Sequence, residues 1–328
     1  MTKVVRVHVQ GGPEALRIED LTVGPPGAGE ARVRIHAIGL NRSEALFRSG
    51  GYIQPPSLPA LIGYEASGVV EALGEGVTGF AVGDRVSILP KFRQGPYGVY
   101  AEAALVPASS LLAIPESLGM QEAAAVWMQY LTAMAITEVG KAAIGDHVII
   151  TAASSSVGLA AIQLANWAGA VPIAATRTSA KAQALKAHGA AHVVATAESD
   201  LAAEVKRITA GKGARLVFDP VGGPYVETLA QAMAPEGVMF IYGGLSGQPT
   251  PYPHWTAAMG GLSLRGWVAS FIWDHPDRFA KAVDLVLRGL AGGHLKPVID
   301  RTFTLDQIVE AHRYLESNQQ VGKVVVTV

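Results

Sequence analysis

Along the first 120 residues, hydrophobic and polar positions alternate in short runs that glycine and proline interrupt. Residues 1–9 and 32–38 place an apolar side chain at about every second position, and residues 66–73 and 83–88 form two further short runs. Alternation with period two predicts half-buried strands, because successive side chains of a strand point to opposite faces of the sheet. Short strands separated by turn residues predict a β-rich, barrel-like unit.

Beyond Met120 the alternation gives way to continuous apolar runs. Residues 121–139 are rich in alanine and predict a helix. From Gly145 onward, six short apolar runs predict strands at residues 147–151, 171–176, 192–194, 216–219, 238–242 and 263–267. The intervening segments predict helices at residues 158–168, 180–188, 201–209 and 225–233. This rhythm is typical of a doubly wound parallel sheet of the Rossmann type, so the expected fold class is α/β.

The chain leaves this rhythm after Trp273. The pattern there predicts helices at residues 277–290 and 305–317 and strands at residues 298–303 and 321–328. We assign this tail to the first unit. The expected domains are a discontinuous β-rich domain, residues 1–121 and 271–328, and a dinucleotide-binding domain, residues 122–270.

Composition narrows the function classes. The 328 residues are enough for two domains, and 49% hydrophobic with 16% charged residues excludes a disordered chain. A net charge of −1 gives no sign of a nucleic-acid or acidic-membrane surface. The absence of cysteine excludes disulfides and thiolate metal sites. No apolar run is long enough for a membrane span and the start lacks a signal-peptide pattern, so we expect a soluble, cytoplasmic protein.

A serine-rich turn follows the first strand of the predicted Rossmann domain. The dinucleotide fingerprint G-x-G-x-x-G would place glycines at positions 153, 155 and 158, where the chain has Ala, Ser and Gly. The physical requirement is for small residues and a helix N-terminus, so that the backbone can approach a pyrophosphate. Ser155, Ser156, Val157 and Gly158 meet this requirement. An ordinary serine-rich helix N-cap would give the same residues.

The end of the second predicted strand bears on the choice of cofactor. An NAD site places an acidic residue there for the ribose 2′-hydroxyl. The chain instead has Thr176, Arg177 and, four residues further, Lys181. Cations and hydroxyl donors suit a 2′-phosphate, which favours NADP(H). The alternative is that Arg177 and Lys181 form only the solvated start of a helix.

Several blocks of the chain resemble, in order, those of the zinc-independent medium-chain dehydrogenases/reductases. Residues 39–52, GLNRSEALFRSGGY, resemble the pattern G-x-N-x-x-D-x-x-x-R-x-G-x-Y of the quinone-oxidoreductase-like (zeta-crystallin-type) branch. The further matching blocks are residues 63–70, 83–86, 131–133, 219–223 and 322–325. The resemblance spans essentially the whole chain and implies a Rossmann domain joined to a β-rich, GroES-like domain. The chain departs from the branch at Glu44, at Ser155 and Ser156, and at Thr196, where the usual residues are Asp, a Gly pair and, in some members, Tyr.

The resemblance also implies site residues. Asn41, Tyr52 and Tyr64 are the implied catalytic candidates, with Asn41 on the nicotinamide or ribose and one of the tyrosines, Tyr52 before Tyr64, donating to a substrate oxygen. Asn41 also counts among the cofactor contacts, which the resemblance extends to Thr132, Val221, Gly243, Gly244, Phe271 and Lys323.

The zinc-containing alcohol dehydrogenases are relatives of this family, and they bind a catalytic zinc through Cys, His-Glu and a second Cys. At the corresponding blocks the chain has Asn41 and the pair Tyr64-Glu65, and it has no cysteine. One carboxylate does not make a zinc site, so we expect no metal. Without a Lewis acid, hydride addition to a quinone or an activated C=C is easier than reduction of a simple ketone, because hydrogen-bond donors stabilise the conjugated oxyanion.

The resulting hypothesis is an NADPH-dependent reductase that acts, without metal, on a quinone or an α,β-unsaturated carbonyl, with a small-molecule substrate and neither nucleic-acid nor membrane partners. The alternatives are an enoyl-thioester reductase of the same superfamily and a non-enzymatic structural or binding role of the same fold. An apolar sixth strand, residues 262–267, together with the family resemblance, suggests a homodimer.

Overall fold

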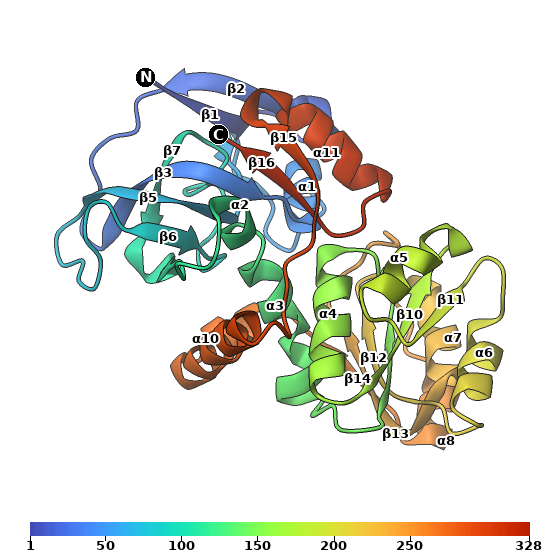
Figure 1. The fold of residues 1–328 in the computed structure, drawn as a ribbon. Coiled ribbons are helices and arrows are strands. Elements are labelled where there is room, and N and C mark those ends of the chain that lie inside the picture. Colours follow the sequence, from blue (N-terminus) through green and yellow to red (C-terminus); the bar gives the residue numbers. More distant parts are fainter. The chain divides into compact units, whose positions relative to one another are not determined.

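The computed structural model describes all 328 residues, and its contacts divide the chain into two compact units (Figure 1). Unit 1 consists of residues 1–128 and 297–328, and unit 2 consists of residues 129–296. The β-rich unit is therefore discontinuous in sequence, and its strands are built from both ends of the chain.

These boundaries differ from those expected from the sequence, 121/122 and 270/271. Residues 271–296 belong to unit 2 because their end packs against a helix of that unit. The His294 ring stacks on Trp167, with 5.0 Å between ring centroids. The Gln163 side chain donates to the Lys296 carbonyl and accepts from the Lys296 N–H, at 3.0 and 2.9 Å.

Unit 1 contains two sheets. A three-stranded sheet has the order β2-β1-β4, and its bounds are β1 Thr2–Val7, β2 Leu16–Leu21 and β4 Ala60–Leu61. The larger sheet has the order β15-β16-β3-β5-β6-β8, with β7 also paired to β3; its strands are β3 Glu30–Gly39, β5 Glu65–Leu73, β6 Arg85–Ile88, β7 Ala103–Pro107, β8 Leu111–Ala113, β15 Ile299–Thr304 and β16 Lys323–Thr327. Strand β16 runs antiparallel to β3 and parallel to β15, so the C-terminal residues form an inner strand of this sheet, next to its edge strand.

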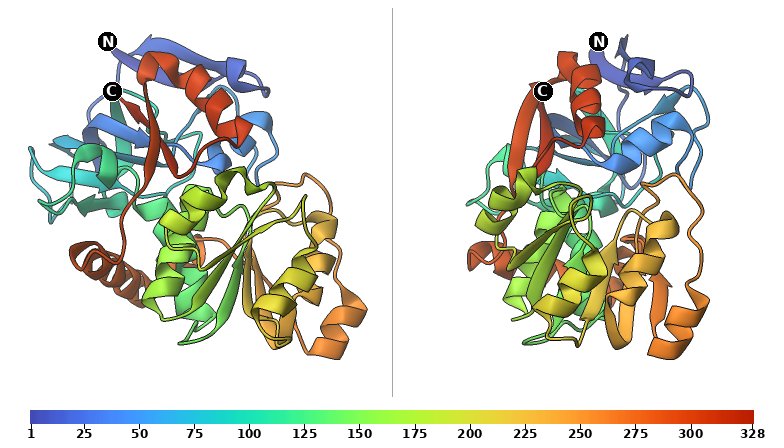
Figure 2. Two further views of the ribbon diagram at one scale, coloured as in Figure 1. Left: turned by 45° about the vertical axis from the view of Figure 1, so that its right-hand side comes forward. Right: turned by 90° about the vertical axis from the view of Figure 1, so that its right-hand side faces the viewer.

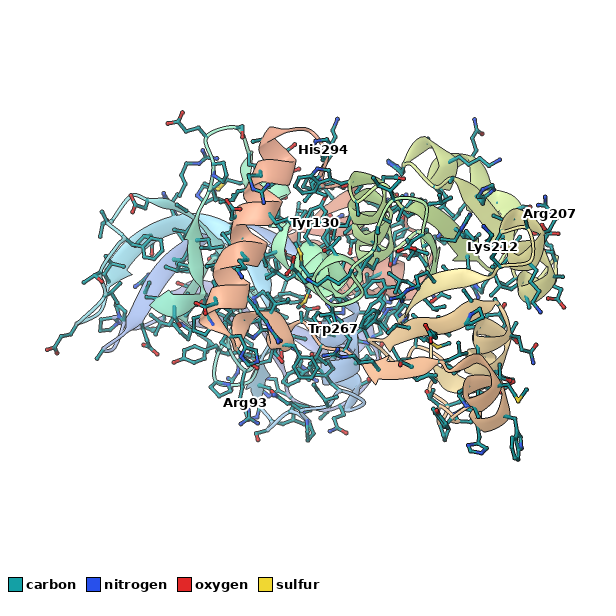
Figure 3. The ribbon with its side chains drawn as sticks, turned by 90° about the horizontal axis from the view of Figure 1, so that it is seen from below. Arg93, Tyr130, Arg207, Lys212, Trp267 and His294 are labelled. Carbon is teal, nitrogen blue, oxygen red and sulfur yellow. The ribbon has the colours of Figure 1, made fainter.

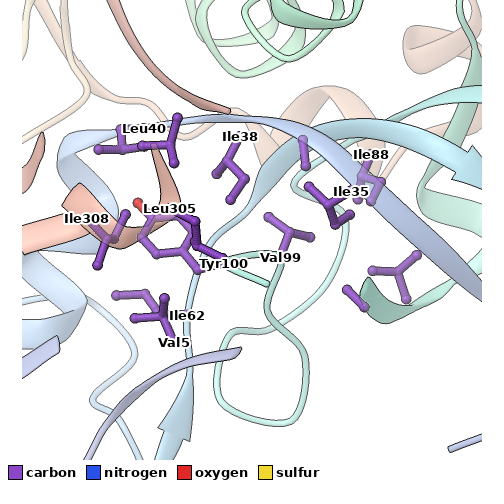
Figure 4. Close-up of a cluster of buried hydrophobic side chains, with 14 of the residues drawn as sticks. Val5, Ile35, Ile38, Leu40, Ile62, Ile88, Val99, Tyr100, Leu305 and Ile308 are labelled. Carbon is purple, nitrogen blue, oxygen red and sulfur yellow. The ribbon is translucent and has the colours of Figure 1, made fainter. Parts of the chain in front are cut away.

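Strands and short helices enclose the main apolar core of unit 1, beside which lies a smaller cluster of Ala37, Ala124, Ala125 and Val325. The helices are α1 Arg42–Ser49, α2 Met120–Ala123 and α11 Ile308–Ser317. Figure 4 shows the core, in which residues far apart in the chain, such as Val5, Ile62 and Ile308, are buried together. This burial follows in part from the alternation in the sequence, because every second side chain along residues 31–37 of β3 is buried.

Unit 2 is a six-stranded parallel sheet with the order β11-β10-β9-β12-β13-β14, as predicted for a doubly wound fold. Its strands are β9 His147–Ile150, β10 Val171–Thr176, β11 His192–Ala195, β12 Ala214–Asp219, β13 Met233–Ile241 and β14 Ser263–Gly266. Its helices are α3 Trp127–Met134, which begins at the end of unit 1, α4 Ser156–Trp167, α5 Ala182–Ala187, α6 Leu201–Ile208, α7 Val226–Gln231, α8 His254–Gly260, α9 Ser270–Trp273 and α10 Pro276–Ala291. Helices cover both faces of the sheet (Figure 2).

The single helix expected over residues 121–139 is wrong. The segment is broken into α2, α3 and a π-helical turn at Ala135–Val139. The break is caused by tertiary contacts, since the buried Glu65 carboxylate accepts the Trp127 and Met128 N–H groups at 2.6 and 2.9 Å. A carboxylate at this position acts as the N-terminal cap of a new helix.

No helix of the protein is both long and apolar enough to cross a membrane.

A buried polar cluster joins α1 to α11 in unit 1. The Arg48 side chain is 1% exposed and contacts His312 Nδ1 at 2.8 Å, Glu316 Oε1 at 2.7 Å and the Gly11 carbonyl at 3.0 Å. His312 Nε2 lies 3.1 Å from the Tyr100 hydroxyl. Burial, followed by the positive charge of Arg48, lowers the pKa of His312 to about 3, so this histidine is neutral in the folded protein.

The first prediction follows from this lowered pKa. Between about pH 6.5 and pH 3 the unfolded chain binds a proton at His312 that the folded protein excludes, so folding loses stability as the pH falls through this window. One such proton corresponds to a slope of about 1.4 kcal/mol per pH unit. Urea unfolding from pH 7.5 to pH 4.5 should show a shallower slope for His312→Asn than for the wild type.

The matched control is His254→Asn, which changes an exposed histidine of unit 2 and should leave the wild-type slope intact. Equal slopes for His312→Asn and the wild type would contradict the assignment of a neutral, buried His312.

Candidate functional site

The turn after β9 in unit 2 has the geometry of an anion-binding helix N-terminus. Helix α4 is twelve residues long, and its N-cap, Ser155, accepts the Gly158 N–H at 3.0 Å through its hydroxyl. Ser154, Ser156 and Val157 are half-buried, so the surface of the turn is accessible. The free N–H groups of the first turn and the positive end of the helix dipole favour a negatively charged group here.

Gly158 is required by close packing within this turn. A Cβ at Gly158 would lie 2.5 Å from the Ala153 carbonyl oxygen, closer than real contacts allow. The sequence retains a glycine at the one fingerprint position where the backbone leaves no room. Positions 154–156 are only half-buried and hold serine.

Cationic side chains gather beside this turn, at the carboxyl end of β10. Lys181 Nζ donates to the Ser154 hydroxyl at 3.0 Å, which brings an ammonium to the start of α4. Arg177 is exposed, and its guanidinium makes no hydrogen bond or ion pair with the protein. Thr176 lies half-buried at the end of the strand. The structure thus brings together the four elements of the predicted phosphate site: the turn, Thr176, Arg177 and Lys181.

One residue of this region was missed by the sequence analysis. The Glu198 carboxylate accepts the N–H and the hydroxyl of Ser179 through Oε1, at 2.8 and 3.2 Å. Glu198 follows β11, whose carboxyl end lies beside that of β10 in the parallel sheet. An acidic residue four positions after the predicted strand at residues 192–194 is the signal that could have located it.

The carboxyl end of β12 is held by Asp219, which is fully buried. Its carboxylate accepts the Thr151 hydroxyl and the N–H groups of Val221 and Gly222, the latter two at 3.1 and 2.8 Å. A Cβ at Gly243 would lie 2.6 Å from the Pro220 carbonyl oxygen, while Gly244 faces open space. Val221, Gly243 and Gly244 therefore lie at the same sheet edge as the phosphate turn.

The side chain of Tyr242 follows β13 at this edge. Its ring stacks on Phe218, with 4.1 Å between centroids and 18° between planes. Its buried hydroxyl has no hydrogen-bond partner in the protein. A buried, unpaired hydroxyl is uncommon and leaves one donor free at the carboxyl edge of the sheet.

Thr132 and Phe271, two of the expected cofactor contacts, are linked in unit 2 through one tryptophan. The Trp267 indole N–H donates to the Thr132 carbonyl at 2.8 Å, and its ring meets Phe271 edge to face at 5.8 Å. Phe271 is 41% exposed and Thr132 is buried. Figure 3 shows Trp267 in the same unit as Tyr130 and His294, while Arg207 and Lys212 lie on an outer surface of that unit.

The candidates of unit 1 belong to a buried polar network. The Lys323 ammonium donates to Asn41 Oδ1 and to Glu65 Oε2, both at 2.6 Å, and Lys323 and Glu65 are both fully buried. The other oxygen of Glu65 accepts the Trp127 and Met128 N–H groups. The network thus joins β16, β5, the loop before α1 and the start of α3.

Glu44 is the second carboxylate of this network. Its Oε1 accepts the Asn41 amide at 3.1 Å and the Tyr64 N–H at 3.3 Å. Burial raises the pKa of Glu44 to about 7, against the opposing effects of the hydrogen bond from Asn41 and the charge of Lys323. The sequence analysis noted Glu44 only as a departure from the family pattern.

Tyr52 and Tyr64 start a row of aromatic rings. The centroid distances are 6.4 Å from Tyr52 to Tyr64, 5.8 Å from Tyr64 to Phe92 and 6.0 Å from Phe92 to Tyr97. Burial raises the pKa values of Tyr52 and Tyr64, so both phenols stay protonated at neutral pH. They can therefore donate hydrogen bonds to a developing oxyanion.

The predicted residues fall into two sets. Asn41, Tyr52, Tyr64 and Lys323 lie in unit 1, where Asn41 contacts Lys323 directly. The remaining candidates lie in unit 2. No group of three or more His, Asp or Glu side chains is arranged to hold a metal ion.

Comparison with known families gives two matches. Residues 27–116 match the alcohol dehydrogenase GroES-like domain, and residues 156–288 match the zinc-binding dehydrogenase domain. The two matches fall on unit 1 and unit 2, respectively.

Individual proteins are similar along their full length. A quinone oxidoreductase of Pseudomonas aeruginosa is 31% identical, with 99% of each chain covered. A 2-haloacrylate reductase of a Burkholderia species is 30% identical, again with 99% of each chain covered. The crystal structure of Escherichia coli quinone oxidoreductase complexed with NADPH has a TM-score of 0.92 at 28% identity and covers 99% of this chain and 100% of its own.

Proposed function

The chain belongs to the zinc-independent, quinone-oxidoreductase-like branch of the medium-chain dehydrogenases/reductases, and we propose that it is an NADPH-dependent reductase of quinones or α,β-unsaturated carbonyls. The observation that carries the proposal is the phosphate turn of unit 2, with Lys181 on Ser154 and an unpaired Arg177 beside it. The name of the zinc-binding dehydrogenase domain does not by itself assign a metal, and we expect none, because the chain lacks the cysteine ligands of the zinc-containing relatives.

The residues present fit a dinucleotide. The pyrophosphate would be held at Ser155–Gly158 by hydroxyls and by N–H groups of the first turn of α4. The 2′-phosphate would be held by Arg177 and Lys181, since no acidic side chain ends β10. The Tyr242 hydroxyl, buried without a partner at the same sheet edge, is a further donor that the protein itself does not use.

When bound, the cofactor supplies the hydride. The electrophilic carbon of the substrate accepts this hydride, and the electron pair moves onto the conjugated oxygen, which then takes a proton to complete the two-electron reduction. Tyr52 and Tyr64 are protonated phenols of unit 1 that would donate hydrogen bonds to that oxygen. Asn41 would orient the nicotinamide or ribose, with its side chain fixed by Lys323 and Glu44.

Three functions can be separated by one assay. NADPH oxidation is measured with a 1,4-quinone, an enone and an enoyl-CoA ester, each in the presence and absence of a chelator. Turnover of the quinone or the enone, unaffected by chelation, is the expected result. Turnover of the enoyl-CoA ester alone would favour the enoyl-thioester reductase, and no turnover with any of the three would favour a non-enzymatic role.

The second prediction concerns the cofactor. Arg177→Ala should raise the dissociation constant for NADPH about 10- to 100-fold, the effect of losing one charge-assisted phosphate contact. NADH affinity should change little, because NADH lacks the 2′-phosphate. The control is Arg207→Ala, which removes an exposed cation of α6 that pairs with Glu204. Equal NADPH affinities for Arg177→Ala and the wild type would refute this 2′-phosphate site.

The third prediction concerns the phenols. Tyr52→Phe should lower kcat for an enone about 100-fold, the usual effect of removing one preorganised donor, with a smaller loss for Tyr64→Phe and for the more easily reduced quinone. Tyr97→Phe, at the far end of the aromatic row, should retain wild-type turnover. If Tyr52→Phe and Tyr64→Phe both keep wild-type kcat on both substrates, these hydroxyls have no chemical role.

The fourth prediction is a homodimer. Strand β14 ends the parallel sheet with one edge unpaired, and the neighbouring helix α8 exposes Trp255 by 77% and Met259 by 88%. An unpaired edge with large apolar side chains beside it is suited to pairing with a symmetry mate. Light scattering at micromolar concentration should give twice the chain mass of 34.2 kDa, and a monomer mass would contradict the proposal.

A further inference from the structure

Glu44 occupies a central position among the candidate catalytic groups of unit 1. One oxygen of its carboxylate contacts both Asn41, at 3.1 Å, and the Tyr64 N–H, at 3.3 Å. The side chain is fully buried, and its electrostatic influence extends to the Tyr52 phenol. Glu44 is therefore connected to all three of the residues to which the family resemblance assigns the chemistry.

The network has two carboxylates but only one cation that can neutralise them. The Lys323 ammonium is bound at 2.6 Å to Glu65, and its other contact is the uncharged Asn41 side chain. Arg48 lies on the same helix as Glu44, but its guanidinium is bound to His312, Glu316 and the Gly11 carbonyl. The negative charge of an ionised Glu44 would thus have no counter-ion in contact, which is costly for a buried carboxylate.

We propose that Glu44 is a titrating positioning residue: with its proton bound it holds Asn41 and the backbone of Tyr64 in place without adding charge, and without that proton it opposes the negative charge that develops on the substrate oxygen. This inference rests on the proposed reductase function and deepens it by assigning the site its own pH dependence. Glu44 contacts neither substrate nor cofactor in this scheme and acts through Asn41 and the two phenols.

The groups that face Glu44 are consistent with this role. Asn41 and Ser43 lie at the start of α1, the helix that carries Glu44. The other groups are Lys323 from β16, Glu65 from β5, and the phenols Tyr52, Tyr64 and Tyr100 from the neighbouring loops. Burial, the largest influence, and the charge of Glu65 favour the protonated form, whereas the hydrogen bond from Asn41 and the charge of Lys323 favour the ionised form. The sum of these influences raises the pKa of Glu44 to about 7.

A route for proton exchange is present. The second carboxylate oxygen, Oε2, lies 3.3 Å from the Ser43 hydroxyl, and Ser43 is half-buried. A hydroxyl both accepts and donates, so Ser43 can pass a proton between solvent and the buried carboxyl group. The exchange leaves the hydrogen bonds that Oε1 accepts from Asn41 and Tyr64 in place.

The negative charge of an ionised Glu44 should slow hydride transfer. Hydride addition places a negative charge on the conjugated oxygen before that oxygen is protonated, and a like charge nearby raises the energy of this state. An ionised Glu44 also raises the pKa values of Tyr52 and Tyr64, which weakens them as donors. Hydride transfer should therefore be fastest when Glu44 is protonated and slow as the pH rises through about 7.

The experiment, the fifth prediction, measures the rate of hydride transfer in a single turnover, from the loss of NADPH absorbance, with an enone between pH 5.5 and pH 9. The wild-type rate should fall at least about fivefold across this range, with a one-proton midpoint near 7. Glu44→Gln, which keeps an oxygen that can accept from Asn41 and Tyr64, should vary less than about twofold and exceed the wild type at pH 9.

Two further variants complete the measurement of how the hydride-transfer rate depends on pH. Glu44→Asp keeps a titrating carboxyl group and should retain an alkaline decline, which a purely structural role of Glu44 would not require. Glu75→Gln removes an exposed carboxylate of the same unit and should reproduce the wild-type profile. An alkaline decline in Glu44→Gln equal to that of the wild type, or a wild-type rate that is constant from pH 5.5 to pH 9, would overturn the proposal.

A second measurement does not depend on activity. Infrared difference spectra of the purified protein should show the carbonyl stretch of one protonated carboxylic acid that disappears with a midpoint near pH 7 and is missing in Glu44→Gln. If no substrate is reduced but this band titrates, the reductase function fails while the assignment of the Glu44 proton stands. If substrates are reduced and the band is absent at pH 6, the proposal for Glu44 fails alone.

Discussion

The buried ion pair between Lys323 and Glu65 is the interaction on which the organisation of unit 1 depends. Both side chains are fully buried, and their charges meet at 2.6 Å. A buried pair is tolerated only when its remaining donors and acceptors are also satisfied. That condition is met by Asn41 on the side of Lys323 and by the Trp127 and Met128 N–H groups on the side of Glu65. The pair thereby fixes the last strand, the start of α3 and the amide of a candidate catalytic residue at once.

The charge balance of this pair also explains the environment of Glu44. Because Lys323 already neutralises Glu65, the second carboxylate is left without a counter-ion in contact, and its burial raises its pKa to about 7. The close approach of β3 to the neighbouring segment contributes, since a Cβ at Gly39 would lie 1.9 Å from the Ala124 carbonyl oxygen and 2.8 Å from the Lys323 side chain. Any side chain at this position would collide with the Ala124 carbonyl oxygen and with Lys323.

Local sequence patterns accounted for the individual strands of the parallel sheet and for the turn before α4, because a strand and a turn of small residues depend on neighbouring residues. The strand predicted at 171–176 matches β10, and the helix after the serine turn begins within two residues of its expected start. The helix predicted over residues 121–139 was wrong because Glu65, some sixty residues earlier in the chain, caps a new helix at Trp127. The boundary at 270/271 differs from the observed one because the stacking of His294 on Trp167 joins residues distant in sequence.

In the candidate site, too, local features were predicted from the sequence and long-range contacts were not. The family blocks pointed to Asn41, Tyr52 and Tyr64, and the serine-rich turn pointed to a phosphate site; these roles remain predictions. Glu44 was only a departure from a pattern, since its environment depends on burial and on which carboxylate Lys323 contacts. Lys323 was assigned to the cofactor, whereas its ammonium contacts Asn41 and Glu65 inside the protein; a role in cofactor binding remains a prediction. Glu198 was missed because its contact with Ser179 joins two loops that only the parallel sheet brings together.

The most direct test of the central ion pair is a double-mutant cycle on the free energy of unfolding in urea at pH 7.5, with Lys323→Met, Glu65→Gln and the double variant. Lys323→Met should lose about 3–5 kcal/mol, because it leaves a buried carboxylate unpaired, and the double variant should recover part of that loss. Arg288→Met, which breaks the exposed pair with Asp284, should cost less than about 1 kcal/mol. Losses that simply add in the double variant, or a Lys323→Met protein as stable as the wild type, would contradict the account.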